Sequence, residues 1–463
     1  MSATNRESGD RLLSADSLTR RNLFRAGGAA GLTFAAGGFL SACGGGGSST
    51  GSSAGGSGVG IQPGLGKELA DVLGVTAEDV KLAGKQTWRL GVALPLSGQG
   101  ALEGVRQSRG VELARKHIAL AGGPKIKYDE RDHKSGDAAS GALIARTFGA
   151  NKIGAQITSY IGILGSEVPG IGQYKIMTFD PGGSVGAFTS KPYFWAGRIL
   201  TPQDLMGGAF GWLGQAHPDM KRVAFVFPDF GDVSVKGFHT YLSAAIKAGG
   251  QQVVAESKYK FGTTDFSSTI RALQAAPKFD MVFLVGYGRD PGYFLKQYKS
   301  AGLTAQVMTT DLGSDARKIA GDAYKNLWVA LEYFDFNAPP NRLSKIFVDA
   351  YRKAYGEPTA DNVVTANYYE STLNMWALAR RVMRKGGDPN SGEALQAALT
   401  SEPTLPSVYG GSSTELGAMS WDTQTHQLDA RPMSMLKITD PDGPPEIAAT
   451  YGIGGKDLKV IKS

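Results

Sequence analysis

The sequence has few of the residues that build disulfide or metal-bound frameworks. Its 463 residues contain a single cysteine, Cys43, so neither an internal disulfide nor a thiolate metal site can form. The five histidines are scattered without the spacing of a metal site: His117, His133, His217, His239 and His426. We therefore expect no bound metal.

Signals for nucleic acids, nucleotides and membrane spans are also missing. The net charge of +7 is mild for this length, and no block of Lys and Arg with interleaved aromatics occurs, which argues against a nucleic-acid partner. There is no G-x-x-x-x-G-K-[ST] loop, and the GYG at 286–288 lacks the third glycine of a dinucleotide site, so we expect no cofactor. The uncharged run Ala26–Leu40 is shorter than the roughly twenty apolar residues of a membrane-spanning helix.

One serine fits the pattern of a hydrolase. Residues 182–186 read GGSVG, which matches G-x-S-x-G around Ser184, but that pattern needs a helix that starts at the serine. Here the residues after the serine have no helical run. The histidines also offer no triad partner in the required chain order. We therefore expect a protein that is not an enzyme.

The first 43 residues have the composition of an export signal. Residues 19–25 read TRRNLFR, which resembles the twin-arginine motif, and the uncharged run Ala26–Leu40 follows. The run ends in LSAC at 40–43, which resembles a bacterial lipobox, where the cysteine is lipidated and the chain is cut before it. Acyl chains on Cys43 would anchor the protein in a membrane. We expect an exported lipoprotein on the periplasmic or cell-surface face of a bacterial cytoplasmic or outer membrane.

Two short segments separate this leader from the main body. Residues 44–60 read GGGGSSTGSSAGGSGVG, a composition that cannot bury apolar surface and is typical of a flexible tether. Residues 61–85 carry a short helical pattern, Leu65, Leu69, Val72 and Leu73, and we expect this N-terminal extension to pack loosely on the body.

From Trp88 the chain alternates apolar strands with amphipathic helices. We expect strands at 88–94, 126–130, 152–157, 175–179, 222–227, 252–256, 281–285 and 306–308, and helices at 105–120, 137–148, 205–215, 233–248, 266–276 and 292–300. This spacing indicates parallel sheets covered on both faces, with ligands bound at the edge where the strands end. The rhythm restarts after Thr201-Pro202, which indicates two lobes. Helices over 341–384 and strands over 431–450 indicate that the chain crosses between the lobes more than once.

A set of short motifs runs along this body in a distinctive order. They are LGVALPLSG at 90–98, AGG at 121–123, YDERD at 128–132, DAA at 137–139, FG at 230–231, GY at 286–287, MTTD at 308–311 and MSWD at 419–422. In this order and spacing, over roughly residues 86–440, they resemble the leucine/isoleucine/valine-binding type of periplasmic proteins, which serve ABC transporters.

The resemblance implies an α/β fold of two Rossmann-like lobes with parallel sheets, joined by three hinge crossings near residues 198–202, 331–334 and 417–421. One lobe would comprise residues 86–199 with 335–417, and the other residues 200–334 with 418–463. A small molecule would bind in the cleft between the lobes, and a membrane permease would recognise the closed form. The alternative is a ligand-sensing module that acts with a separate membrane signalling partner; the lipid anchor favours transport.

Carried over position by position, the resemblance places ligand contacts on loops at the strand ends. In the first lobe, Thr158 and Ser159 begin a helix, where hydroxyls and free N–H groups can bind a carboxylate. Gly182 would offer a close backbone contact and Ser184 a hydroxyl. An ordinary helix cap and a plain turn are the alternative roles of these residues.

In the second lobe, the corresponding positions are Phe230, Tyr287 and Asp311. The two aromatic rings would close over the ligand as flat walls. Asp311 falls where amino-acid binders carry an acid for the ligand's ammonium, which needs a partner when it is buried. Phe230 could instead belong to the core, and Asp311 could instead cap the next short helix.

Some positions depart from the family's pattern. Amino-acid binders more often carry Tyr at Phe230, Glu at Asp311 and alanines at Gly182-Gly183, and Asp180 adds a second acid near the site. These differences argue against leucine, isoleucine and valine as ligands. Another amino acid, an amide, a urea-like compound or an aromatic acid remains.

Overall fold

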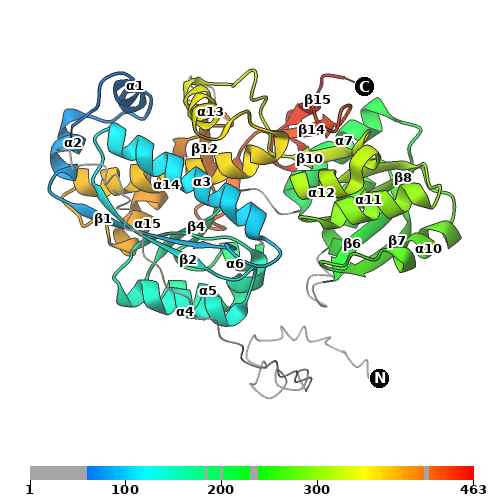
Figure 1. Ribbon diagram of the computed structural model, residues 1–463, viewed down its shortest axis with the longest axis horizontal. Coiled ribbons are helices and arrows are strands. Elements are labelled where there is room, and N and C mark those ends of the chain that lie inside the picture. Colours follow the sequence, from blue (N-terminus) through cyan, green and yellow to red (C-terminus); the bar gives the residue numbers. More distant parts are fainter. Residues whose placement is uncertain (1–59, 183–185, 199–201, 230–237, 411–416, 463) are drawn as a thin grey trace, which may run out of the picture. The chain divides into compact units, whose positions relative to one another are not determined.

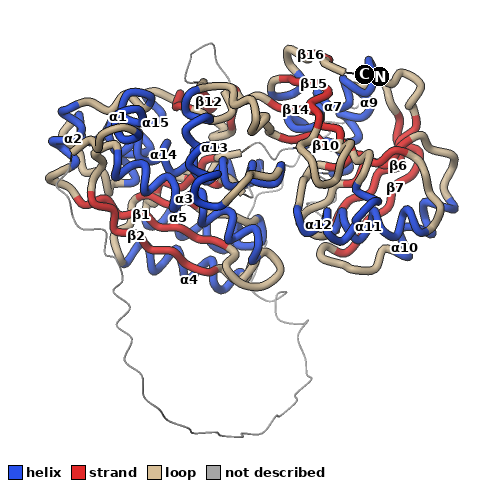
Figure 2. Tube along the Cα trace, turned by 45° about the horizontal axis from the view of Figure 1, so that its top comes forward, coloured by secondary structure: helices blue, strands red, loops and turns tan. Residues whose placement is uncertain are grey.

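The computed structural model describes residues 60–182, 186–198, 202–229, 238–410 and 417–462 (Figure 1). Strands and helices alternate along most of these residues, and the strands form three sheets (Figure 2). The predicted α/β class is therefore confirmed. Within the described ranges, no helix combines the length and hydropathy that a membrane crossing requires.

The first sheet has five parallel strands in the order β2-β1-β3-β4-β5. The strands are β1 (Thr87–Leu94), β2 (Lys125–Asp132), β3 (Ala155–Ile157), β4 (Met177–Asp180) and β5 (Phe194–Ala196). Trp88 and Leu94 near the two ends of β1 are fully buried, as expected for a strand covered on both faces. Because the strands are parallel, the loops after β3 and β4 lie at the same edge.

Helices cover this sheet on both faces. They are α3 (Ala101–Leu120), α4 (Ala138–Ala150), α5 (Ile161–Tyr174), the single turn α6 (Gly186–Thr189) and, from later in the chain, α14 (Val363–Arg384). α4 packs on α5, and α3 packs on α14 on the opposite face (Figure 1). α6 is a short helix where the sequence predicted none, but it begins two residues after Ser184 and has only four residues.

The second sheet has eight strands in the order β16-β15-β14-β10-β9-β8-β6-β7. Five of them are parallel: β6 (Arg222–Asp229), β7 (Gln252–Lys260), β8 (Met281–Leu284), β9 (Gln306–Thr309) and β10 (Trp328–Leu331). The antiparallel strands β14 (Met433–Lys437), β15 (Glu446–Tyr451) and β16 (Lys459–Val460) extend it. The loops after β8 and β9, which carry Tyr287 and Asp311, therefore share one edge.

Helices precede and follow these strands; those up to residue 300 lie close to the predicted ranges, whereas the two between residues 314 and 324 have no predicted range. They are α7 (Pro202–Ala216), the π-helical turn η1 (Phe238–Leu242), α9 (Ser243–Ala248), α10 (Ser267–Ala275), α11 (Asp290–Ser300), α12 (Ser314–Ala320) and η2 (Gly321–Tyr324). The chain then returns to the first sheet through α13 (Arg342–Tyr355), η3 (Ala360–Asn362), α14 and α15 (Gly392–Ser401). A last short turn, η4 (Ile453–Gly455), precedes β16.

The third sheet changes one predicted boundary. It consists of β11 (Thr404–Pro406), β12 (Ala418–Trp421) and β13 (Leu428–Ala430). The sequence prediction assigns residues 418–430 to the second lobe, but the Trp421 indole donates to the Ala196 carbonyl at 2.6 Å and stacks on Phe179 of the first sheet. The chain enters the eight-stranded sheet only at Met433. The third passage therefore falls at residues 431–432 and not at 417–421, because burial of this tryptophan holds β12 on the first sheet.

The N-terminal extension packs more firmly than its sequence predicts. It forms α1 (Leu65–Val72) and α2 (Ala77–Ala83), and the side chain of Leu69 is fully buried. Asp79, 2% exposed, accepts hydrogen bonds from Arg384 at 2.5 and 2.6 Å. Arg380 donates to the carbonyls of Leu73 and Gly74 at 2.8 and 3.0 Å. Two arginines of α14 thus hold the extension on this helix.

Candidate functional site

The loop after β3 brings two predicted residues together. Thr158 and Ser159 are both fully buried. The Thr158 hydroxyl donates to Glu167 Oε2 at 2.7 Å, and Glu167 Oε1 accepts from Gln156 Nε2 at 2.6 Å. Ser159 Oγ lies 3.0 Å from His133 Nε2. Both hydroxyls therefore have protein partners, and their contact with a ligand stays a prediction.

The buried partners of this loop are held in defined protonation states. Burial raises the pKa of Glu167 to about 8. Burial also lowers the pKa of His133 to about 4, so the ring is neutral at pH 7. Because His133 Nδ1 accepts from the Gly136 N–H, its proton sits on Nε2, which donates to Ser159. These bonds fix the loop that would meet the ligand.

The loop after β4 lies against the first loop and against α14. The Gly182 N–H donates to Asp180 Oδ1 at 3.0 Å. A Cβ at Gly182 would lie 2.3 Å from Tyr368 Oη and 2.9 Å from Ser159 Cβ. Only glycine fits this position without displacing its neighbours. Tyr368, which the sequence did not indicate, lies against Gly182, and the predicted contact of Gly182 with a ligand stays a prediction.

Three predicted residues fall outside the part of the chain that the structure describes. They are Cys43, Ser184 and Phe230. The predicted lipidation and the two predicted ligand contacts at these positions stay predictions.

The edge of the second sheet brings Tyr287 and Asp311 together. Asp311 Oδ1 accepts from the Leu312 N–H at 2.9 Å, and its Oδ2 lies 3.5 Å from the Gly288 nitrogen. Burial raises the pKa of Asp311 above its ordinary value, and the charge of Arg198 opposes part of that rise. Burial and then the negative charge of Asp311 raise the pKa of Tyr287. The two residues therefore share one electrostatic environment, as their positions after neighbouring parallel strands predict.

The charge of Asp311 also affects the pKa of a carboxyl group on α3, the helix that follows β1 of the first sheet. Glu103, in the first turn of α3, pairs with Arg106 at 2.5 Å, and Arg106 pairs with Asp361 at 2.6 Å. Burial raises the pKa of Glu103 to about 7; Arg106 opposes this rise, and the charges of Asp311 and Asp361 add to it. The sequence analysis missed Glu103, although an acidic residue in the first turn of the helix after a buried strand is a usable signal.

Tyr160 is a second residue that the sequence analysis missed. It precedes α5 with φ 77°, a left-handed backbone that is rare for a bulky side chain and concentrates at functional sites. Burial raises its pKa to about 12, with further contributions from the charges of Glu103 and Asp311. Groups from both sheets therefore act on one another at this place.

A pocket adjoins this cluster. Its lining comes from the loop after β9, from the residues before α14 and from the loop after β14: Leu312, Gly313, Arg317, Tyr324, Ala360, Asp361, Ile438, Pro441 and Gly443. Parts of both predicted lobes thus line one cavity. The described residues contain no group of three histidine, cysteine or acidic side chains that could hold a metal ion.

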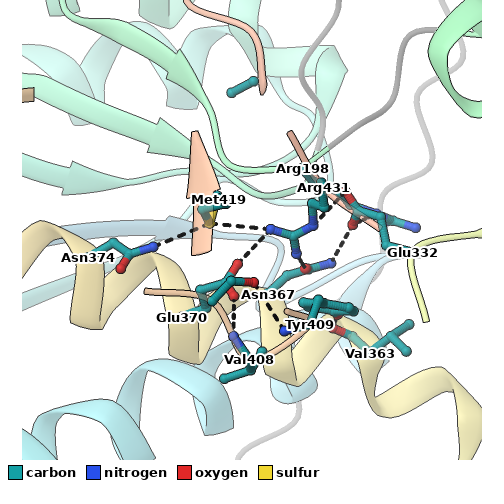
Figure 3. Close-up of polar contacts among 12 residues, drawn as sticks. Arg198, Glu332, Val363, Asn367, Glu370, Asn374, Val408, Tyr409, Met419 and Arg431 are labelled. Atoms are coloured by element: carbon teal, nitrogen blue, oxygen red, sulfur yellow. Dashed lines mark hydrogen bonds and ion pairs between the residues drawn. The ribbon is translucent and has the colours of Figure 1, made fainter. Parts of the chain in front are cut away.

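An ion network connects the three passages of the chain between the sheets (Figure 3). Arg198 follows β5, Glu332 follows β10 and Arg431 follows β13. Arg431 Nη1 donates to Glu370 Oε1 and its Nη2 to Asn367 Oδ1, both at 2.6 Å. Arg431 Nε lies 3.1 Å from Glu332 Oε1, and Arg198 Nε lies 3.4 Å from Glu332 Oε2. Glu332, on the second connection between the sheets, therefore contacts the arginines of the other two connections.

Comparisons with known proteins now identify the family. The family model described as periplasmic binding protein matches residues 87–444. The chain belongs to the periplasmic binding protein family. A leucine-, isoleucine-, valine-, threonine- and alanine-binding protein of Pseudomonas aeruginosa is 25% identical over 335 residues, 69% of this chain and 84% of that protein. The Leu/Ile/Val-binding protein homolog 7 of Brucella abortus is 24% identical over 314 residues, 63% of this chain and 76% of that protein.

Solved structures share the fold of this periplasmic binding protein. The branched-chain amino acid transporter substrate-binding protein LivJ from Streptococcus pneumoniae, in complex with isoleucine, has a TM-score of 0.65 at 20% identity and covers 79% of this chain and 99% of its own. A solute-binding protein of an ABC transporter from R. palustris, in complex with benzoate, has a TM-score of 0.63 at 18% identity and covers 82% and 98%. The predicted fold is confirmed. The chain belongs to a family of binding proteins and is not an enzyme.

Proposed function

We propose that this periplasmic binding protein is the exported, lipid-anchored solute-binding component of an ABC importer. It captures a small amino-acid-like or related polar metabolite, namely an amino acid, an amide or an aromatic acid, between its two α/β lobes. A membrane permease then receives the ligand from the closed form. Binding shifts an equilibrium between open and closed arrangements of the lobes.

One observation carries the proposal. Residues of the loop after β9 in the second sheet line one pocket with Asp361, which pairs at 2.6 Å with Arg106 of α3, the helix that follows β1 of the first sheet. In parallel α/β sheets the strand-end edge is the usual place for a ligand. Carboxyl groups and aromatic rings that meet there suit a small polar ligand with an apolar part.

The relatives and the leader support the choice of ligand and location. Named relatives bind branched-chain amino acids, threonine and alanine, and structural neighbours bind isoleucine and benzoate. The TRRNLFR motif, the uncharged run and the LSAC sequence support export by the twin-arginine route and lipidation at Cys43.

Thermal unfolding against a ligand panel tests the proposal. The full-length protein is denatured and refolded to remove bound ligand, and its Tm is measured with amino acids, amides, urea-like compounds and aromatic acids. A true ligand at 100 times its Kd adds about 2.7 kcal/mol of stability. We expect Asp311→Asn and Tyr287→Ala to abolish the shift, and Asp219→Asn, at an exposed turn, to leave it unchanged. No shift with any compound would refute the proposal.

A further inference from the structure

Arg198 is a buried arginine with one long ion pair among the described residues. Its side chain is only 9% exposed. Within the described residues its guanidinium makes a single ion pair, from Nε to Glu332 Oε2 at 3.4 Å, and Nε has no hydrogen-bond acceptor. A buried charge with so weak a partner is unfavourable unless another group satisfies it.

The neighbouring arginine of the same network has more partners, although its Nε, like that of Arg198, has no hydrogen-bond acceptor among the described residues. Arg431 makes two hydrogen bonds of 2.6 Å, to Glu370 and to Asn367, and lies closer to Glu332, at 3.1 Å, than Arg198 does. Glu332 is thus shared between two arginines and favours Arg431. Figure 3 shows Arg198 beside this pair.

A second unsatisfied polar group lies next to Arg198. A Cβ at Gly197 would lie 3.0 Å from Ser371 Oγ, and this hydroxyl, in a residue 2% exposed, has no hydrogen-bond partner in the described part of the chain. The Gly197 N–H donates to the Asp180 carbonyl at 2.8 Å, which keeps Arg198 beside the loop of Gly182. Among the described residues, a buried guanidinium with one long ion pair and a buried hydroxyl without a hydrogen-bond partner therefore lie near the strand ends of the first sheet.

The geometry points to Arg198 as the carboxylate-binding residue of the site. The terminal nitrogens of its guanidinium bind the carboxylate of the ligand in the two-pronged arrangement that arginine favours. The ligand class is then a small carboxylic acid, either an amino acid or an aromatic acid, and not an amide or a urea. This inference rests on the proposed function, since it names the ligand class of the same site. The charge of Arg198 also reaches Asp311 and Tyr287 on the other sheet, as expected if all three line one site.

Matched acids and amides test this inference on the full-length protein, stripped of bound ligand. Titration calorimetry compares each amino acid and each aromatic acid with its primary amide, for example leucine with leucinamide and benzoate with benzamide. We expect an acid to bind the wild-type protein at least about tenfold more tightly than its amide. Arg198→Gln should weaken the acid by about 10- to 100-fold and the amide by less than about twofold. Arg198→Lys, which keeps the charge and loses the fork, should fall between.

Arg342→Gln is the matched control. Arg342 pairs with Asp71 at 2.9 Å on the surface, with 40% of its side chain exposed, and its loss should leave acid binding unchanged. Equal wild-type affinity for acid and amide would overturn the inference, as would full acid affinity in folded Arg198→Gln. If Arg198→Gln does not fold, the wild-type acid-to-amide ratio and Arg198→Lys decide. Binding of amides or ureas without acids would refute the inference and leave the proposed function standing, whereas no binding by any compound would refute both.

Discussion

Removing the guanidinium of Arg431, at the centre of the ion network, should lower the protein's stability substantially. Arg431, Glu332 and Glu370 are all 0% exposed, and Arg431 contacts both carboxylates. Arg431→Gln would leave two buried carboxylates without their main partner. Breaking a buried pair in this way costs about 3 to 5 kcal/mol. With an unfolding entropy of about 2.1 cal/mol/K per residue, roughly 400 folded residues convert this loss into a Tm decrease of about 4 to 6 °C.

Urea denaturation and calorimetry of the full-length protein measure this loss. Arg342→Gln is again the matched control, because an exposed ion pair contributes at most about 1 kcal/mol. The double variant Arg431→Gln/Glu370→Gln should recover part of the stability lost in Arg431→Gln, since it removes one of the stranded charges. The reasoning is refuted if Arg431→Gln loses no more stability than Arg342→Gln, or if the two network substitutions are simply additive.

Three further predictions concern buried positions elsewhere in the chain. Burial raises the pKa of Glu167 from 4.5 to about 8, so its contribution to stability is present below pH 4.5 and is lost as the pH rises to about 8. Urea unfolding at several pH values should show that Glu167→Gln lacks this decline. Parallel pH profiles of the variant and the wild type would contradict this prediction. Gly182→Ala would place a methyl group 2.3 Å from Tyr368 Oη and should weaken ligand binding by at least about tenfold in calorimetry. Gly172→Ala is the control, because its added methyl group would have no neighbouring atom within 4 Å, and it should bind as the wild type does. Asp79→Ala leaves two arginines of α14 without their carboxylate and should cost about 3 kcal/mol in chemical denaturation; a loss under about 1 kcal/mol would mean that the N-terminal extension is not held by this pair.

Much of the fold can be predicted from the sequence because the spacing of apolar residues along each helix or strand indicates which of its residues are buried. The apolar run at 281–285 predicts β8, which the structure places at Met281–Leu284 with every residue buried. Asp137 predicts the start of α4 and caps it. Tyr287 and Asp311 follow neighbouring parallel strands, so their meeting at one edge could be predicted from the order of strands and helices alone.

The polar residues of the site were harder to predict. Glu103 lies in the first turn of α3 and Arg198 follows β5, and their local sequence does not show which charged groups they meet. Thr158 was predicted as a ligand contact, and the sequence did not indicate that its hydroxyl donates to Glu167, nine residues later in α5. That carboxylate sits on a helix whose position over the sheet depends on packing.

The sequence by itself determined the α/β alternation, the class of binding protein and the loops where a ligand would lie, because these depend on local periodicity and on the order of elements. Only the tertiary structure decided which distant residues meet. Arg198, Glu332 and Arg431 are far apart in the chain and form one network, and Trp421 holds β12 on the first sheet. The physical reason is that periodicity records whether a side chain is buried, whereas its partner depends on how whole sheets and helices pack together.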